Sequence, residues 1–246
     1  MQCQRKKTPR ITLTPQRLTW FLCAVAFALI ALHILAQVIL WAFSYDVQGF
    51  AGQLLSRFDL DAEISVPTWY NQMLLLLGAG LAGYIAAALF AAKKPHRYYW
   101  AGVAFALLFA SIDEGASIHE MLGFLEIAGY LGLESSYFAF GWVIPGLMIV
   151  GALVLVFLRF WLQLPRRTQV LIATAVTMYL AGAIGIEMLS ANYLASGGEW
   201  NSLLYRGLLV SIEESLEVFG IIVMIYALAD FISTHKLRLD MRIAKK

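Results

Sequence analysis

Long apolar stretches separated by short polar segments dominate this chain. Five stretches of mostly apolar residues are evident, and a sixth appears when a few acidic residues are accepted within it. A helix of about 20 residues, rising 1.5 Å per residue, crosses the ~30 Å hydrocarbon core of a bilayer. The pattern predicts six transmembrane helices, at residues 18–43, 68–92, 99–120, 138–160, 168–190 and 207–230.

The composition excludes a water-soluble domain and favours a single membrane unit. Apolar residues make up 61% of the 246, and charged residues only 14%, against roughly 25% in soluble domains. The apolar run from Leu18 is about twice as long as a signal-peptide core, so we expect it to be retained as an anchor. We predict an all-α polytopic membrane helical bundle at residues 18–232, between basic tails at 1–17 and 233–246.

Basic residues are confined to alternate connections between the predicted helices. Of the 18 Lys and Arg residues, 16 lie in the two tails, in 93–97 and in 159–167. Because Lys and Arg favour cytoplasmic loops, this distribution predicts that the N and C termini and these two connections are cytoplasmic. The acidic connections would then lie outside.

Aromatic and apolar residues near the predicted helix ends fit the same orientation. Trp prefers the membrane interface. We expect the seven tryptophans to lie there and not around a cofactor: Trp20, Trp41, Trp69, Trp100, Trp142, Trp161 and Trp200. Val47, Phe50, Leu54 and Phe58 recur at helical spacing, which predicts a helix lying on the outer surface. We expect the same of Met121–Leu133.

Seven acidic residues lie within or at the ends of predicted spans, where charge is costly. They are Asp113, Glu114, Glu120, Glu187, Glu213, Glu214 and Glu217. An ionised side chain at the bilayer centre costs about 2.5–3.5 kcal/mol, and such residues usually line an ion path, a proton relay or a binding site. Counting from the cytoplasmic ends places Asp113 and Glu217 at one depth, roughly 18 Å from the inner boundary. The other acids lie further out, so the pattern predicts a polar funnel open to the outside.

Helical spacing gathers these acids on a few faces. At 100° per residue, Asp113, Ser117 and Glu120 fall within ~60° and form one seam. The three acids of the last helix share a ~100° wedge by the same geometry. We therefore expect the third, fifth and sixth predicted helices to touch and to bring their acids together.

The charge of the acids has to be compensated. Arg206 is the only basic residue near the outer ends of these three helices. Carboxylates held close in a low dielectric cannot all be ionised, so either some keep protons or a cation neutralises them. A purely structural alternative is that the acids pair with Arg206, tyrosines and backbone groups and lock the bundle.

Carboxylates with one imidazole suit iron, manganese, zinc or magnesium. We predict a site for one or two such divalent ions, with ligands drawn from Asp113, His119, Glu120, Glu187, Glu214 and Glu217. Dimetal helical bundles use Glu-x-x-His pairs, and this chain has none. His33, in the middle of the first predicted helix, either packs through hydrogen bonds or joins a site.

Three segments carry a resemblance to a known family. Residues 58–69 (FDLDAEISVPTW), 111–120 (SIDEGASIHE) and 213–220 (EESLEVFG) resemble those of a family of uncharacterised bacterial multi-pass membrane proteins. The resemblance implies a multi-pass fold, located in the bacterial inner (cytoplasmic) membrane, and no particular activity. Separately, Glu214-Ser-Leu-Glu217 is similar to the Glu-x-x-Glu core of high-affinity iron permeases, although Glu213 stands where their motif has Arg.

Three functions follow as hypotheses. The first is a membrane-embedded metalloenzyme that acts on a lipid or a small amphiphile from the outer side. The second is a proton- or cation-coupled transporter that uses the same acids. The third is a non-catalytic membrane scaffold. The expected partners are the lipid bilayer and a lipid or small-molecule substrate, not nucleic acid, because the basic tail suits anionic headgroups; the pattern fixes no oligomeric state.

Overall fold

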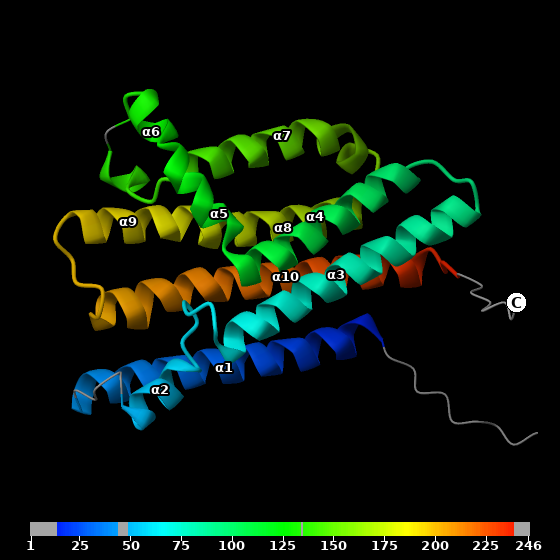
Figure 1. Cartoon of the computed structure of the whole chain (residues 1–246). Helices are drawn as coiled ribbons and strands as arrows, with labels where there is room; N and C mark the ends of the chain where they lie inside the picture. The colour runs from blue at the N-terminus through cyan, green and yellow to red at the C-terminus, as the bar shows by residue number, and fades with distance from the viewer. Residues whose placement is uncertain (1–13, 44–48, 134, 239–246) are drawn as a thin grey trace, which may run out of the picture.

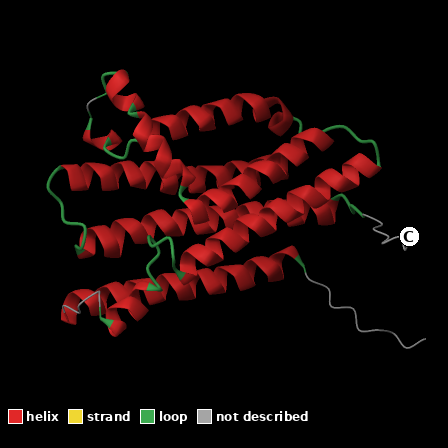
Figure 2. Ribbon diagram, viewed as in Figure 1, coloured by secondary structure: helices red, strands yellow, loops and turns green. Residues whose placement is uncertain are grey.

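The computed structural model describes residues 14–43, 49–133 and 135–238. Within these ranges the regular secondary structure is helical throughout, and loops alone connect the helices (Figure 2). Five helices are long and apolar enough to cross a membrane, or six if one bent pair counts as a single span. The prediction of an all-α chain is therefore confirmed for the described residues, and its long helices have the length and composition that a membrane span requires.

The long helices follow the predicted order. Three are single rods and the last two are continuous with π-helical segments. They are α1 (Pro15–Phe43), α3 (Val66–Ala91) and α7 (Val143–Leu162); then α8 (Arg166–Leu180), η3 (Ala181–Ile186) and α9 (Glu187–Ala195); and finally η4 (Leu203–Leu209) and α10 (Val210–Thr234). π-helical turns are rare and occur often at functional sites.

The third predicted helix, 99–120, is not continuous. Helix α4 (Arg97–Ala116) ends before Ser117, whose φ of 45° is left-handed. The following short segments, α5 (Ile118–Met121), η1 (Leu122–Leu125) and α6 (Ile127–Tyr130), leave the axis of α4 at 77°. A left-handed residue cannot continue a right-handed helix. The chain therefore turns sharply at the depth of the predicted acids.

Helix α10 is the central element of the bundle. It packs against α1, α3 and α8, while α4 packs mainly against α3 (Figure 1). Small residues permit the close approach of α3 and α4, since the Cα of Gly83 faces the methyl group of Ala104. Ala79, one turn before Gly83 in α3, is buried as well, so this face of α3 packs inside the bundle.

A tightly packed apolar core fills one end of the bundle. Its fully or nearly fully buried members come from α3, α4, α7, the turn after α7, and α10. They are Ala82, Ile85, Ala86, Trp100, Phe160, Leu164, Leu228 and Phe231. Trp100 is only 1% exposed and lies against Phe160 and Phe231. Trp100 lies in the first turn of α4, the helix end where it was predicted, but neighbouring helix ends cover its ring.

The basic connections lie together at this same end. The start of α1, the turn between α3 and α4, the turn between α7 and α8, and the end of α10 all lie on the right of Figure 1. The opposite end carries α2 (Phe50–Ser56), the short segments after α4, and the connection from α9 to η4. This arrangement agrees with the alternation of basic and acidic connections in the sequence.

Two surface segments were predicted at the acidic end, and both are helical there. Phe50 and Leu54 of α2 are 85% and 54% exposed, as expected of a helix that offers apolar side chains to its surroundings; Val47 lies outside the described residues. The segment 121–133 folds into short turns, with Phe124 and Tyr130 almost fully exposed.

Candidate carboxylate site

The bend at Ser117 folds His119 back onto Asp113. The backbone N–H of His119 donates to Asp113 Oδ1 over 2.8 Å, and His119 Nδ1 lies 2.9 Å from Oδ2. An aspartate that accepts such local hydrogen bonds stabilises a chain reversal in place of another helical turn. The predicted seam of Asp113, Ser117 and Glu120 is therefore wrong, and Glu120 lies beyond the bend with an exposed side chain.

Trp142 links this reversal to the fifth span. Its ring packs edge-on against His119, with 4.9 Å between ring centroids, and its Nε1 donates to Glu187 Oε1 over 2.8 Å. Sequence reasoning assigned Trp142 to the membrane interface and missed this role. Its position just before α7, opposite a histidine and a glutamate, follows only from the bend after α4.

The π-helical segment η3 brings Glu187 against α10. A Cβ added to Gly182 of η3 would lie 2.6 Å from the carbonyl oxygen of Glu213, so only glycine permits this approach. The carboxyl groups of Glu187 and Glu213 consequently come within hydrogen-bonding reach of each other. A carboxyl group can hydrogen-bond another only when one of them carries the proton.

Deeper along α10, three further acids share one region. Glu217 is only 8% exposed, and it interacts electrostatically with Glu114 of α4 and with Glu214. Asn71 Nδ2 of α3 donates to Glu114 Oε1 over 2.9 Å. The hydroxyl group of Tyr179, on α8, approaches Glu217. The structure thus brings acids from the third, fifth and sixth predicted spans together, as the sequence indicated.

Two polar atoms beside these acids are buried without a partner in the described part of the chain. They are Asn71 Oδ1 and Ser190 Oγ, and each residue is only 1% exposed. Asn71 binds Glu114 through its other terminal atom, and Ser190 neighbours Glu213. Native proteins rarely leave such oxygens unsatisfied, and each one calls for a water molecule, an ion or another bound group.

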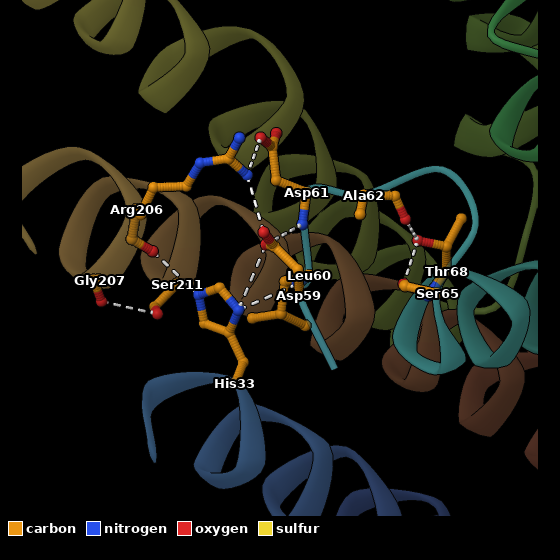
Figure 3. Close-up of polar contacts among 10 residues, drawn as sticks. All are labelled: His33, Asp59, Leu60, Asp61, Ala62, Ser65, Thr68, Arg206, Gly207 and Ser211. Carbon is orange, nitrogen blue, oxygen red and sulfur yellow. Dashed lines mark hydrogen bonds and ion pairs between the residues drawn. The ribbon is translucent and has the colours of Figure 1, made fainter. Parts of the chain in front are cut away.

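Arg206, the one cation expected to compensate the acids, is bound elsewhere. Its Nη1 donates to Asp59 Oδ2 over 2.8 Å and to Asp61 Oδ2 over 3.0 Å (Figure 3). These aspartates belong to the connection between α2 and α3, which the sequence placed outside the cluster. The structural alternative in which Arg206 pairs with the seven acids is therefore wrong. Among the ion pairs of the described residues, only that of His119 with Asp113 involves any of the seven.

His33 anchors the same connection from below (Figure 3). It is fully buried; its Nδ1 accepts a hydrogen bond from the N–H of Leu60 over 3.0 Å, and its Nε2 lies 2.9 Å from the carbonyl oxygen of Arg206. Nε2 therefore carries the ring proton. Both ring nitrogens have backbone partners. Of the two roles considered for His33, this is the one in which it packs through hydrogen bonds.

The connection between α2 and α3, whose aspartates bind Arg206, also interacts with the clustered carboxylates. Asp61 interacts electrostatically with Glu120, Glu187 and Glu213 as well as with Arg206. Burial raises the pKa of Asp61 to about 6; Arg206 opposes this shift, and Asp59 and Glu120 add to it. Asp61 therefore interacts both with Arg206 and with Glu187 of α9 and Glu213 of α10.

The predicted metal ligands are not assembled as a metal site. Across residues 14–43, 49–133 and 135–238, no three His, Cys, Asp or Glu side chains are placed so that they could hold a metal ion. Asp113 and His119 bind each other, Glu187 binds Trp142, and Glu120 is exposed. Glu214 and Glu217 lie next to each other but deeper in the bundle. The structure lends no support to a divalent metal among these residues.

Residues 21–231 match the model of one protein family, which is described as a domain of unknown function (DUF8692). Because the match covers most of the chain, the protein belongs to this family. No curated protein and no solved structure matches the chain.

Proposed function

We propose that this member of the DUF8692 family is a membrane transporter that exchanges protons bound in its carboxylate cluster for a cation. In this proposal the six apolar spans lie in a bacterial inner membrane with both termini in the cytoplasm. The connections 93–97 and 159–167 and the ends of α1 and α10 next to the basic tails lie at one end of the bundle, which supports that orientation.

The observation that carries the proposal is the contact between Glu187 and Glu213. Both carboxyl groups lie in apolar spans and within hydrogen-bonding reach of each other. Arg206, the nearest candidate to neutralise them, is bound to Asp59 and Asp61. Two adjacent carboxylates without a cation would repel strongly in a low dielectric, so a shared proton is the simplest compensation.

Neighbouring groups give this proton a route along the cluster. His119 contacts Asp113 directly and Glu187 electrostatically, and Glu213 neighbours Glu214, which neighbours Glu217. Histidine and carboxyl groups in series are typical proton relays within membranes. The unpartnered Asn71 Oδ1 adds a neutral oxygen ligand for an incoming cation that replaces the lost proton.

The inner end of the cluster is closed. The apolar core around Trp100, Ile85 and Leu228 lies between the acids and the basic end of the bundle. The apolar core at this end is compatible with an outward-facing state. Such a protein would need alternating access, which requires only a site near the midplane.

The metalloenzyme hypothesis stays a prediction beside this one. It requires metal bound to protein purified without chelator, and a loss of both metal and thermal stability in Glu217→Gln. The proton-exchange proposal instead expects Glu217→Gln to keep its stability or gain some, because a neutral amide replaces a carboxyl group that can carry a proton. A scaffold would show neither metal nor transport.

Transport can be measured in liposomes that contain the purified protein and a trapped pH-sensitive dye. Addition of sodium, potassium or the organic cation tetraphenylphosphonium outside should raise the internal pH for at least one cation. Glu213→Gln should abolish this response, while Glu199→Gln, an exposed acid of the outer connection, should leave it intact. A flat trace for all three cations, equal to protein-free liposomes, would refute proton–cation exchange.

A further inference from the structure

A shallow hollow of about 350 Å³ lies at the acidic end of the bundle, and none of the seven acids of the predicted spans lines it. The connection between α2 and α3 forms one wall and the first turns of α3 the other. It is lined by Arg57, Glu63, Ile64, Ser65, Val66, Trp69 and Gln72. The proposed exchange of protons gives it no role.

The wall of the hollow is held in place by hydrogen bonds. Arg57 binds residues on the far side of its own loop: its Nη1 donates to the carbonyl oxygen of Ile64 over 3.0 Å, and its own carbonyl accepts from Val66 N over 2.9 Å. Thr68 Oγ1 donates to the carbonyl oxygen of Ala62, and Ser65 Oγ caps α3. The hollow is therefore formed before any ligand arrives.

Opposite charges line the hollow without neutralising each other. Among the ion pairs of the described residues, none joins Arg57 to Glu63. Glu63 Oε1 instead accepts from Ser117 Oγ over 2.6 Å. One cation and one anion that face the same hollow separately are complementary to a ligand that carries both charges.

The rim of the hollow is apolar. Ile64 is 78% exposed, Trp69 60% and Val66 41%. Exposed Trp and aliphatic side chains at the start of a spanning helix mark the level of the lipid headgroups. The hollow thus opens where headgroups lie and where acyl chains begin.

We propose that this hollow binds the headgroup of a zwitterionic phospholipid of the outer leaflet, such as phosphatidylethanolamine. The planar guanidinium of Arg57 would take the phosphate, for which its forked donors are suited. Glu63 and the face of Trp69 would take the ammonium group, through charge and a cation–π contact. An anionic headgroup without an ammonium would satisfy Arg57 and leave Glu63 facing negative charge.

The bound lipid would also reach the bend after α4. Glu63 is the partner of Ser117, the left-handed residue at which the chain turns toward His119. A lipid bound in the hollow would therefore affect the hydrogen bond between Glu63 and Ser117 at the bend.

Lipid retention by the full-length protein can be compared by native mass spectrometry. Phosphatidylethanolamine and phosphatidylglycerol with identical acyl chains are added at equal amounts. The parent should retain the ethanolamine lipid roughly tenfold better, the ratio given by one charge-assisted hydrogen bond. Glu63→Gln keeps an acceptor for Ser117 and removes only the charge, so it should bring the two lipids close to parity. Arg57→Gln should reduce retention of both, and Glu199→Gln should match the parent.

Several outcomes would overturn the proposal. Equal retention of the two lipids by the parent would do so, as would a preference that survives both Glu63→Gln and Arg57→Gln in variants that melt like the parent. Soluble glycerophosphoethanolamine should not displace the lipid at matched concentration. Displacement would mean that the hollow recognises a soluble headgroup, contrary to a lipid site. None of these results depends on transport, so they separate this proposal from that of proton–cation exchange.

Discussion

The buried imidazole of His33 donates its Nε2 proton to the carbonyl oxygen of Arg206, 2.9 Å away. Its other nitrogen accepts from Leu60 N–H. One ring therefore joins α1, the connection between α2 and α3, and η4. Replacement of His33 by Leu would leave the buried N–H of Leu60 without its acceptor, at a cost of about 1–3 kcal/mol. Thermal unfolding in detergent should show a large loss for His33→Leu and a smaller one for His33→Gln, whose amide can donate and accept. Equal losses would contradict the hydrogen-bonding role.

The ion pairs of Arg206 should differ in strength. Asp59 is buried, whereas 36% of the Asp61 side chain is exposed. Arg206→Gln leaves Asp59 buried without its cation and should cost about 3 kcal/mol, while Asp61→Asn should cost less than about 1 kcal/mol. Thermal unfolding of the two variants and of the double variant measures the coupling. If Asp61→Asn destabilised as much as Arg206→Gln, the assignment of the main pair to Asp59 would be wrong.

Asp61 should also confer a pH dependence on stability. Its pKa is raised from 3.8 to about 6 in the folded protein, so between these values the folded state binds the proton more tightly than the unfolded state. The stability from this residue is present below pH 3.8, falls as pH rises toward 6, and is constant above. The melting temperature of the parent minus that of Asp61→Asn should therefore be more positive at pH 4.5 than at pH 7. A difference that grows with pH would contradict the raised pKa.

Glycines at the junction of the fifth and sixth spans should tolerate no side chain. A Cβ at Gly220 would lie 2.8 Å from Tyr179 N, and one at Gly182 would lie 2.6 Å from the Glu213 carbonyl oxygen. Because backbone atoms cannot yield, Gly182→Ala and Gly220→Ala should each cost about 1–3 kcal/mol. Gly185, in the same π-helical segment, has no atom within 4 Å of its Cβ position, so Gly185→Ala is a matched control. Its melting temperature should stay near that of the parent.

Hydropathy predicted the long helices because apolar length alone determines which segments can span a bilayer. It could not predict the bend at Ser117, since Gly115, Ala116 and Ser117 are all compatible with a helix. The bend depends on Asp113, whose carboxylate binds the backbone of His119. The only sign of the bend in the sequence was the pair Asp113 and His119, six residues apart. In a continuous helix these two side chains would lie on different faces, so the sequence did not predict their contact.

The sequence likewise did not predict the ion-pair partner of Arg206. Along the chain Glu199 and Glu213 are equally near to Arg206, and the sequence offered the acids of the third, fifth and sixth predicted helices as its partners. The structure joins it to Asp59, which is 147 residues away, because His33 holds that connection under η4. Such long-range pairing follows from packing and from no local pattern. The convergence of the acids could be predicted. A carboxyl group that faces lipid costs more free energy than one that faces the interior of the bundle, so the helices turn their acids toward one another.

Proton sharing between Glu187 and Glu213 is the central claim, and infrared spectroscopy tests it most directly. A protonated carboxyl group has a carbonyl stretching band that a carboxylate lacks, and the band shifts in heavy water. At neutral pH the purified parent should show this band, and both Glu187→Gln and Glu213→Gln should lose the same component of it, while Glu199→Gln keeps it. A parent spectrum at neutral pH without protonated carboxyl groups, or a band unchanged in both variants, would contradict the account.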